Sequence, residues 1–364
     1  MAGRAAKAFL VLIVIVLVVG GGAALFTDTV WGRMHQPYKG YEGAEQFVDI
    51  PQGAGAAEIR RRLIESGVVS DEVTLRAALW WSGRSRSLKA GEYRFDQPMT
   101  PLAVVEKMAT GDVYTRRLTF PEGLTIREMA ALYEEHGFGR AKEFVAAASN
   151  AALINDLDPK ARDLEGYLFP ETYALPRTTP ASHIVELMVE RFRTTYGEVL
   201  RDRELAQGLT LRQVVTLASL VEKETAKSEE RPVVAAVYAN RMKQGMGMQA
   251  DPTVVYALVK AGRYDGNIRK ADLSIDSPYN TYRYPGLPPG PIASPGRASL
   301  EAALTPADVP YLYFVSRNDG THVFAETLTE HNANVYKYQV EYFRRAREAG
   351  SKGPAQPQKS GKRG

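Results

Sequence analysis

Hydrophobic residues follow two different periods along this chain, and one combination of the two occurs twice. Val48 to Gly67 and Leu118 to Gly137 align with each other without a gap. Each stretch contains a short alternating segment, a Pro-x-Gly turn and a run of helical period that stops at a glycine. The pattern therefore predicts a strand–turn–helix unit that is used twice, which is too few copies for a solenoid.

A small α/β domain is predicted around the first copy, over residues 46–117. The periods indicate a helix, a strand and another helix after this copy, over 71–81, 91–95 and 101–110. Trp80 and Trp81 end the first of these helices. They could stack on sugar rings, but paired tryptophans at helical positions belong more often to a core.

The rest of the body, residues 118–348, is predicted to be a larger mixed α/β domain, so the fold class is α+β. Its helical runs are Thr179–Tyr196, Leu211–Ala226 and Glu229–Gln244. A further helix should begin at Asp251, because Asp before Pro makes a good N-cap.

Two other segments of this domain are not helical. Tyr311 to Ala325 predicts a hairpin, with the turn at Arg317–Gly320. Ser277 to Gly296 is rich in Pro, Gly and Tyr, which predicts a fixed irregular loop whose aromatic faces can pack on a substrate.

The N-terminus carries the longest apolar run, Phe9 to Phe26. This length reaches the lower limit for a membrane-spanning helix, and the basic residues in segment 1–8 predict that this end is cytoplasmic. We favour a retained signal anchor in the cytoplasmic membrane over a cleaved signal peptide, although Gly21–Ala24 resembles a cleavage region. Residues 27–45 lack a period and read as a linker.

Composition adds few constraints. The 364 residues have a formal net charge of +4, but much of the basic excess lies at the two ends, so charge indicates a nucleic-acid partner only weakly. The absence of Cys excludes thiol nucleophiles, disulfides and thiolate metal sites. Residues 349–364 have the composition of a disordered basic tail.

Carboxylates are the remaining candidates for chemistry. The chain contains no nucleophilic serine motif, no phosphate-binding loop and no His cluster with metal-ligand spacing, so we expect neither a metal nor a cofactor. The run 211–226 ends in two glutamates. Glu222 projects among apolar residues, where burial would raise its pKa toward that of a general acid, unless it turns to solvent or pairs with Lys223 or Arg212. Glu224 lies in the same broad apolar arc, and periodicity does not rank the two.

Five stretches resemble the YceG-like family of membrane-anchored endolytic murein transglycosylases. They occur in the family's order and read LEGYLFPETY (164–173), ASLVEKET (218–225), QADPTVVYAL (249–258), SPYNTYRYPGLPPGPIASPG (277–296) and HVFAETLTEHNANV (322–335). The resemblance implies that Glu222, the first glutamate of the EKET motif, is the catalytic acid. It also implies that residues 46–117 form a LysM-like module, which either binds glycan or serves only as a spacer.

The implied reaction needs one carboxyl group. Glu222 would protonate the oxygen between N-acetylmuramic acid and N-acetylglucosamine, and then take the proton of the muramic C6 hydroxyl as a 1,6-anhydro ring closes. Polar groups should support the charged centre; the candidates are Gln249, Asn280, Tyr282, Glu165 and Glu171. Glu165 could instead bind backbone amides at a turn.

The family also implies a place and partners for this activity. We expect an enzyme outside the cytoplasmic membrane that cuts nascent glycan strands near peptidoglycan polymerases. Two other hypotheses stay open. The chain could be a glycan-binding scaffold without activity, or an ordinary hydrolase in which Glu222 pairs with a second carboxylate such as Glu171.

Overall fold

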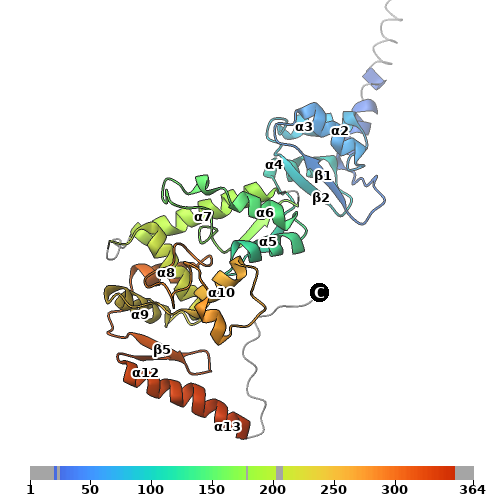
Figure 1. Cartoon of the computed structure of the whole chain (residues 1–364). Helices are drawn as coiled ribbons and strands as arrows, with labels where there is room; N and C mark the ends of the chain where they lie inside the picture. The colour runs from blue at the N-terminus through green and yellow to red at the C-terminus, as the bar shows by residue number, and fades with distance from the viewer. Residues whose placement is uncertain (1–19, 23–24, 178, 202–207, 349–364) are drawn as a thin grey trace, which may run out of the picture. The chain divides into compact units, whose positions relative to one another are not determined.

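The computed structural model describes residues 20–22, 25–177, 179–201 and 208–348 (Figure 1). The chain divides into two compact units. Of the described residues, the first unit comprises those up to 117 with 174–177, and the second comprises 118–173 with those from 179 to 348. Both mix helices with two-stranded sheets, which confirms the mixed α/β class.

The first unit is built on one antiparallel ribbon. Strand β1 (Gln46–Ile50) pairs with β2 (Gly91–Phe95), with Val48 opposite Tyr93. Helices α2 (Ala56–Glu65), α3 (Glu72–Ser82) and α4 (Pro101–Thr110) share a core with these strands. The predicted elements of this part are confirmed, whereas its likeness to a LysM module stays a prediction.

Residues 25–35 are helical, so the linker predicted at 27–45 begins within a helix that the sequence pattern did not indicate. Met34 is buried in the core of the first unit, and Val30 packs against that core one turn earlier. Two apolar residues spaced four apart are enough to dock a short helix, a signal too small to stand out from the polar residues around it.

The predicted membrane anchor at 9–26 lies mostly outside the described residues. Among the residues that are described, no helix combines the length and the apolar character needed to cross a bilayer.

The two adjacent tryptophans of α3 are on the surface, so their interpretation as core residues is wrong. Trp80 is 78% exposed and Trp81 is 56% exposed. Trp31, from the helical residues 25–35, makes an edge contact with Trp81 at a ring-centroid distance of 4.7 Å. The buried face of α3 is formed by Leu75, Ala78 and Leu79 instead.

The second unit contains the second copy of the strand–turn–helix unit. Strand β3 (Arg116–Thr119) is followed by a turn at Gly123 and by α5 (Ile126–Glu135). Gly123 has φ 78° where the first copy has Gly53 at φ 81°, and Gly137 has φ 69° where the first copy has Gly67 at φ 69°. A positive φ at both turns and both helix ends explains the shared glycines, and the predicted repeat is confirmed.

The body of the second unit is helical. After α5 come the helix α6 (Ala141–Ala148), the short 3₁₀ turn η1 (Ala151–Leu153) and strand β4 (Thr172–Leu175), which pairs with β3. The helices that follow are α7 (Ala181–Arg201), α8 (Leu211–Glu224), α9 (Arg231–Lys243), α10 (Asp251–Lys260), the 3₁₀ turn η3 (Lys270–Ser274) and α11 (Arg297–Leu304). Helix α8 is the central one, because it packs against α9, α10 and α11.

The end of the described chain forms a hairpin and a long helical segment. Strand β5 (Tyr313–Ser316) pairs with β6 (His322–Ala325) around the predicted turn. The segment α12 (Leu328–Val335), η4 (Tyr336–Glu341, a π-helix) and α13 (Tyr342–Glu348) follows. The predicted irregular loop 277–296 has no helix or strand, as expected, and the predicted tail 349–364 lies outside the described residues.

Candidate active site

Helix α8 presents its two terminal glutamates on different sides. The helix starts with a capping box between Thr210 and Gln213, and its last turns are buried among apolar neighbours. Glu222 and Glu224 are two residues apart, which corresponds to a rotation of about 200° around a helix. The two carboxylates therefore enter separate environments.

Glu222 is bound on both oxygens. Its Oε1 accepts a hydrogen bond from Arg231 at 3.0 Å, and its Oε2 accepts one from the backbone N–H of Gly296 at 3.0 Å and one from Ser299 Oγ at 2.8 Å. The side chain is only 5% exposed. The prediction that this carboxylate points at an apolar surface is wrong, and its cationic partner is neither Lys223 nor Arg212.

The surroundings of Glu222 connect four segments of the second unit. Arg231, at the start of α9, also bonds to Glu122 at 3.3 Å, and Lys223 donates to the backbone oxygen of Gly123 at 2.9 Å. Gly296 and Ser299 belong to the start of α11. Glu222 therefore holds helices α8, α9 and α11 and the turn after β3 together.

Glu224 lines a pocket instead. The cavity has a volume of about 250 Å³, and its walls are Glu224, Tyr238, Arg241, Met248, Gln249, Asp251, Tyr282, Phe314 and His331. Tyr238, on α9, donates a hydrogen bond to Glu224 Oε1 at 2.8 Å. Burial, and then the nearby Glu224, raise the pKa of Tyr238 well above its usual value, so its hydroxyl keeps its proton and remains a donor.

Tyr282 and Asp251 form a second pair in this pocket. The Tyr282 hydroxyl donates to Asp251 Oδ1 at 2.6 Å, and burial together with this bond raises the pKa of Tyr282. Asp251 is the first residue of α10, whose N-cap is Ala250, so the prediction that Asp251 caps this helix is wrong. The pocket consequently holds two carboxylates, from Glu224 and Asp251.

Gln249 also lies on the pocket wall and is exposed. Its φ is 50°, a left-handed conformation that is uncommon for a residue with a side chain. The backbone N–H donates to the carbonyl of Thr281 at 3.3 Å, which ties this strained position to the loop 277–296. Strain of this kind is frequent where a side chain must be aimed at a ligand.

A cation and an imidazole complete the pocket. Arg241 donates to the carbonyl oxygens of Gly247, Met248 and Leu312, which fixes its guanidinium, and burial lowers its pKa. His331 lies against the ring of Tyr313, with ring centroids 5.2 Å apart. Its Nδ1 is buried and has no hydrogen-bond partner within the described structure, and burial followed by the charge of Arg241 lowers its pKa.

Asn280 has a structural position. Its side chain is fully buried, and its amide nitrogen donates to the carbonyls of Leu273 and Ile275, both at 2.9 Å. Its amide oxygen accepts from the backbone N–H of Tyr282 at 3.0 Å. Both amide hydrogens are thus used by the loop, and Asn280 shapes the segment that carries Tyr282.

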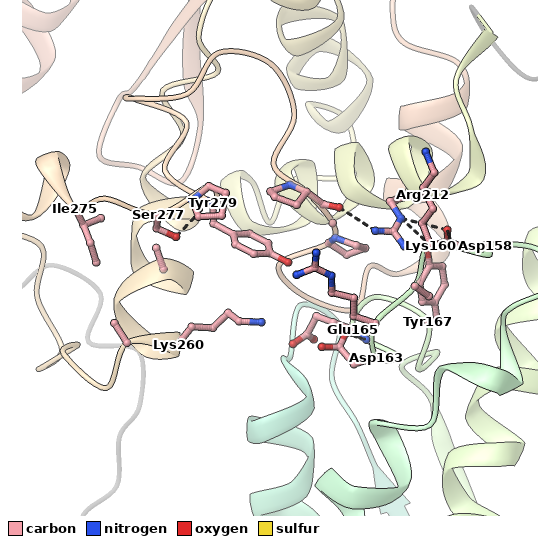
Figure 2. A pocket seen from close by; sticks show the side chains of 18 of the residues that line it. Asp158, Lys160, Asp163, Glu165, Tyr167, Arg212, Lys260, Ile275, Ser277 and Tyr279 are labelled. Atoms are coloured by element: carbon pink, nitrogen blue, oxygen red, sulfur yellow. Dashed lines mark hydrogen bonds and ion pairs between the residues drawn. The ribbon is translucent and has the colours of Figure 1, made fainter.

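Glu165 lies at another cavity, of about 780 Å³, which Figure 2 shows. Its carboxyl accepts from the N–H of Ile126, at the first turn of α5, at 3.0 Å and from the Tyr256 hydroxyl at 3.2 Å. Burial raises the pKa of Glu165 to about 8. The alternative that Glu165 binds a backbone amide is therefore confirmed, although this does not exclude a ligand in the cavity.

Glu171 is on the surface, 40% exposed at its side chain, and forms an ion pair with Arg191 of α7. It does not belong to the walls of the Glu224 pocket. As for metals, the described residues contain no group of three His, Asp or Glu side chains that could hold an ion.

Sequence reasoning did not assign to a site three of the polar residues that line the Glu224 pocket, namely Tyr238, Arg241 and His331. Tyr238 and Arg241 are three residues apart in the run VVAAVYANRM, so both face the same side of α9. This spacing was a usable signal, because a Tyr and an Arg among small apolar residues suggest a polar site. His331 was visible only as a residue near the hairpin, and its place in the pocket depends on the tertiary fold.

The described units thus define a mixed α/β protein with a carboxylate-lined pocket in its second unit. The YceG-like family matches residues 48–337, and the chain belongs to this family. The membership predicted from the five motifs is confirmed.

Comparison with individual proteins supports the same family membership. The chain is 33% identical over 307 residues to the endolytic murein transglycosylase of Bacillus subtilis (strain 168), covering 80% of this chain and 84% of the relative. It is 29% identical over 327 residues to the endolytic murein transglycosylase of Streptococcus pneumoniae serotype 2, and spans 58% of that longer protein. The crystal structure of a yceG-like protein from Listeria monocytogenes matches 80% of this chain and 98% of its own, with 31% identity and a TM-score of 0.55.

Proposed function

We propose that this chain is an endolytic murein transglycosylase. It cuts the bond between N-acetylmuramic acid and N-acetylglucosamine inside nascent glycan strands and leaves 1,6-anhydro-muramic ends, so that strand growth stops. The observation that carries the proposal is the pocket at the end of α8, where Glu224 lies beside tyrosine, arginine and amide groups suited to sugar hydroxyls. The printed names of the bacterial relatives support the same reaction.

We assign the acid to Glu224. The two glutamates of the motif are the candidates, and the family resemblance favours Glu222. However, the Glu222 side chain is 5% exposed and binds Arg231, Gly296 and Ser299, whereas Glu224 lines a cavity of about 250 Å³. A general acid must come within hydrogen-bond distance of the oxygen that it protonates, and this requirement favours the residue at the cavity.

In the proposed reaction, Glu224 donates its proton to the glycosidic oxygen as the bond from that oxygen to C1 of the muramic residue breaks. The C6 hydroxyl of the same residue then attacks C1 and returns its proton to the Glu224 carboxylate. The carboxyl group is regenerated and no water is consumed. Tyr238 donates a hydrogen bond to Oε1 of Glu224 and so orients its carboxyl group.

The positive charge that develops at C1 needs a nearby negative group. Asp251 is the other carboxylate of the pocket, and its bond from Tyr282 holds it in place. We propose that Asp251 stabilises this charge and that Gln249 binds a polar substituent of the sugar. No metal or cofactor takes part in this scheme.

A second candidate function is an ordinary hydrolase, which the two carboxylates of the pocket favour. Glu224 would be the acid and Asp251 the base or nucleophile. Glu171, the partner expected from the sequence, is instead paired with Arg191 on the surface.

Mass spectrometry of the products distinguishes these functions. The full chain is incubated with uncrosslinked glycan strands, and the new ends are identified. Internal fragments with 1,6-anhydro-muramic ends support the transglycosylase, whereas reducing ends support the hydrolase. If the chain binds the strands without cutting them, the result favours the hypothesis of a glycan-binding scaffold.

We also propose that residues 9–26 anchor the chain in the cytoplasmic membrane with the two units outside, close to peptidoglycan polymerases. The exposed cluster of Trp31, Trp80 and Trp81 supports this, because tryptophan is enriched at membrane–water interfaces. Trp31 follows Phe26 by five residues, about 8 Å along a helix, which is close to the depth of the interfacial layer.

This proposal can be tested with the chain's own fluorescence, because its three tryptophans are the three in the cluster. The full chain in vesicles should be quenched by brominated lipids. Absence of quenching would place the cluster away from the bilayer.

A further inference from the structure

The proposed reaction leaves unused the cavity at Glu165 (Figure 2). Its volume of about 780 Å³ lies in the range of ligand sites. A second cavity of about 870 Å³ shares four wall residues with it: Asp158, Lys160, Arg212 and Pro289. We refer to these two neighbouring cavities of the second unit together as the depression, and it includes none of the wall residues of the Glu224 pocket.

The walls of this depression carry unbalanced positive charge. Lys160, Arg162 and Lys260 line it, and within the described residues none of them has a carboxylate within ion-pair distance. Lys260 lies over the rings of Tyr256 and Tyr279, 5.4 Å from each centroid. In Figure 2 its ammonium group points toward the interior of the cavity.

The acids of the cavity offset this charge only in part. Asp158 is bound by Arg212 and by the Tyr167 hydroxyl, and Asp276 is bound by Tyr284 and lies near Arg283. The raised pKa of Glu165 keeps its carboxyl uncharged at neutral pH. Asp163 is the remaining acid of the wall, and it accepts the backbone N–H of Glu165.

One buried donor in the wall has no acceptor. Arg212 uses its Nε for Asp158 and its Nη1 for the carbonyl of Pro289, whereas its Nη2 is buried without a hydrogen-bond partner in the described structure. A buried donor without an acceptor is unfavourable, and an anionic group that reached it from the cavity would satisfy it.

We infer that this depression binds the carboxylates of a peptide, and that its ligand is the stem peptide carried by the muramic residues of the strand. The inference rests on the proposed function for the identity of the ligand. Lysine and arginine side chains would bind the carboxylates, and the ring of Tyr279 with Pro289 and Pro291 would pack against the peptide's apolar groups. The strand would then be held at a point separate from the bond that is cut.

The test is binding, measured by calorimetry on the full chain carrying Glu224→Gln, so that cleavage does not interfere. Three probes are compared: a disaccharide pentapeptide, the same compound with its carboxyl groups amidated, and the disaccharide without peptide. We expect the first to bind and the other two to bind at least tenfold more weakly. Equal binding of all three would overturn the inference, because the sugar alone would then be recognised.

Charge reversals locate the site. Arg162→Glu and Lys260→Glu should each weaken binding of the pentapeptide at least tenfold, since each replaces a cation that would bind a carboxylate by an acid that repels it. Lys142→Glu, an exposed change on α6 outside the cavity, is the matched control and should bind normally. Unchanged affinity in both cavity variants would contradict the inference.

The pH dependence gives an independent check. Glu165 faces the Ile126 N–H, Tyr256, Asp163 and Lys260, and its ionisation above pH 8 would add a negative charge to the wall. Binding should therefore weaken as pH rises through about 8. Glu165→Gln should remove this decline, and a decline that persists in that variant would count against the role of the cavity.

Peptide binding without cleavage by the wild-type chain would refute the proposed function alone.

Discussion

Two glutamates of one helix end have different surroundings. Glu222 is bound by a guanidinium, a backbone amide and a hydroxyl, whereas Glu224 is bound by Tyr238 and borders a cavity. The residue type and the helix are the same, and only the side of the helix differs. The comparison shows that a carboxylate can be buried in order to hold a fold together, so burial alone does not identify a catalytic acid.

The largest effect on stability is expected at Glu222. Glu222→Leu leaves the buried Arg231 with only the half-exposed Glu122 as a carboxylate partner. We expect the free energy of unfolding to fall by about 3 kcal/mol, the lower end of the range for breaking a buried ion pair. Urea unfolding measures the change. The double variant Glu222→Leu with Arg231→Met should recover part of the loss. A single variant as stable as the wild type would mean that Glu222 does not hold the helices.

Glu165 extends the comparison to a third acid, whose pKa is raised to about 8 from 4.5. The folded protein then keeps a proton that the unfolded chain releases, so stability should fall as pH rises from about 4.5 to about 8 and stay level above that. Glu165→Gln mimics the protonated form and should be more stable than the wild type at pH 8. Equal stability of the two proteins at pH 5 and pH 8 would refute this.

Tyr238→Phe tests the surroundings of Glu224. It removes the hydrogen bond that orients the carboxylate, and we expect kcat to fall about fivefold, since one such bond contributes about 1 kcal/mol. The KM should change little, because Tyr238 acts through Glu224 in this account. A rise in KM with an unchanged kcat would instead make Tyr238 a substrate-binding residue.

The smallest effect is expected at Glu171. Its ion pair with Arg191 is exposed, so Glu171→Ala should change stability by less than about 1 kcal/mol. Cleavage of glycan strands should stay at the wild-type rate, as measured by release of anhydro ends. A large loss of activity would revive Glu171 as a partner of the acid.

Local sequence pattern was sufficient for much of the fold. The two strand–turn–helix copies could be predicted because each needs glycine at a left-handed turn and at the helix end, and those glycines stand at matching positions. Strand β2 and helix α4 have the bounds that the periods predict. In these elements, the residues that the local backbone geometry requires agree with those that burial in the core requires.

Long-range contacts decided what could not be predicted. The environment of Glu222 depends on Arg231 from the next helix and on Ser299 from α11, and nothing in the run 211–226 indicates either. The local sequence predicts that Asp251 is a helix cap. Its hydrogen bond from Tyr282 depends on the position of the loop 277–296, which the local sequence does not indicate. The helix at 25–35 was missed because only Met34 and Val30 face the core.

The most direct test of the central claim compares Glu224→Gln with Glu222→Gln on uncrosslinked strands, with circular dichroism and thermal unfolding to show that each is folded. The account predicts that Glu224→Gln unfolds like the wild type but releases anhydro-muramic ends at least 10²-fold more slowly, because it lacks the acid. Glu222→Gln should lose stability and keep much of its activity per folded molecule. A folded, inactive Glu222→Gln beside an active Glu224→Gln would contradict the account and give the catalytic role to Glu222.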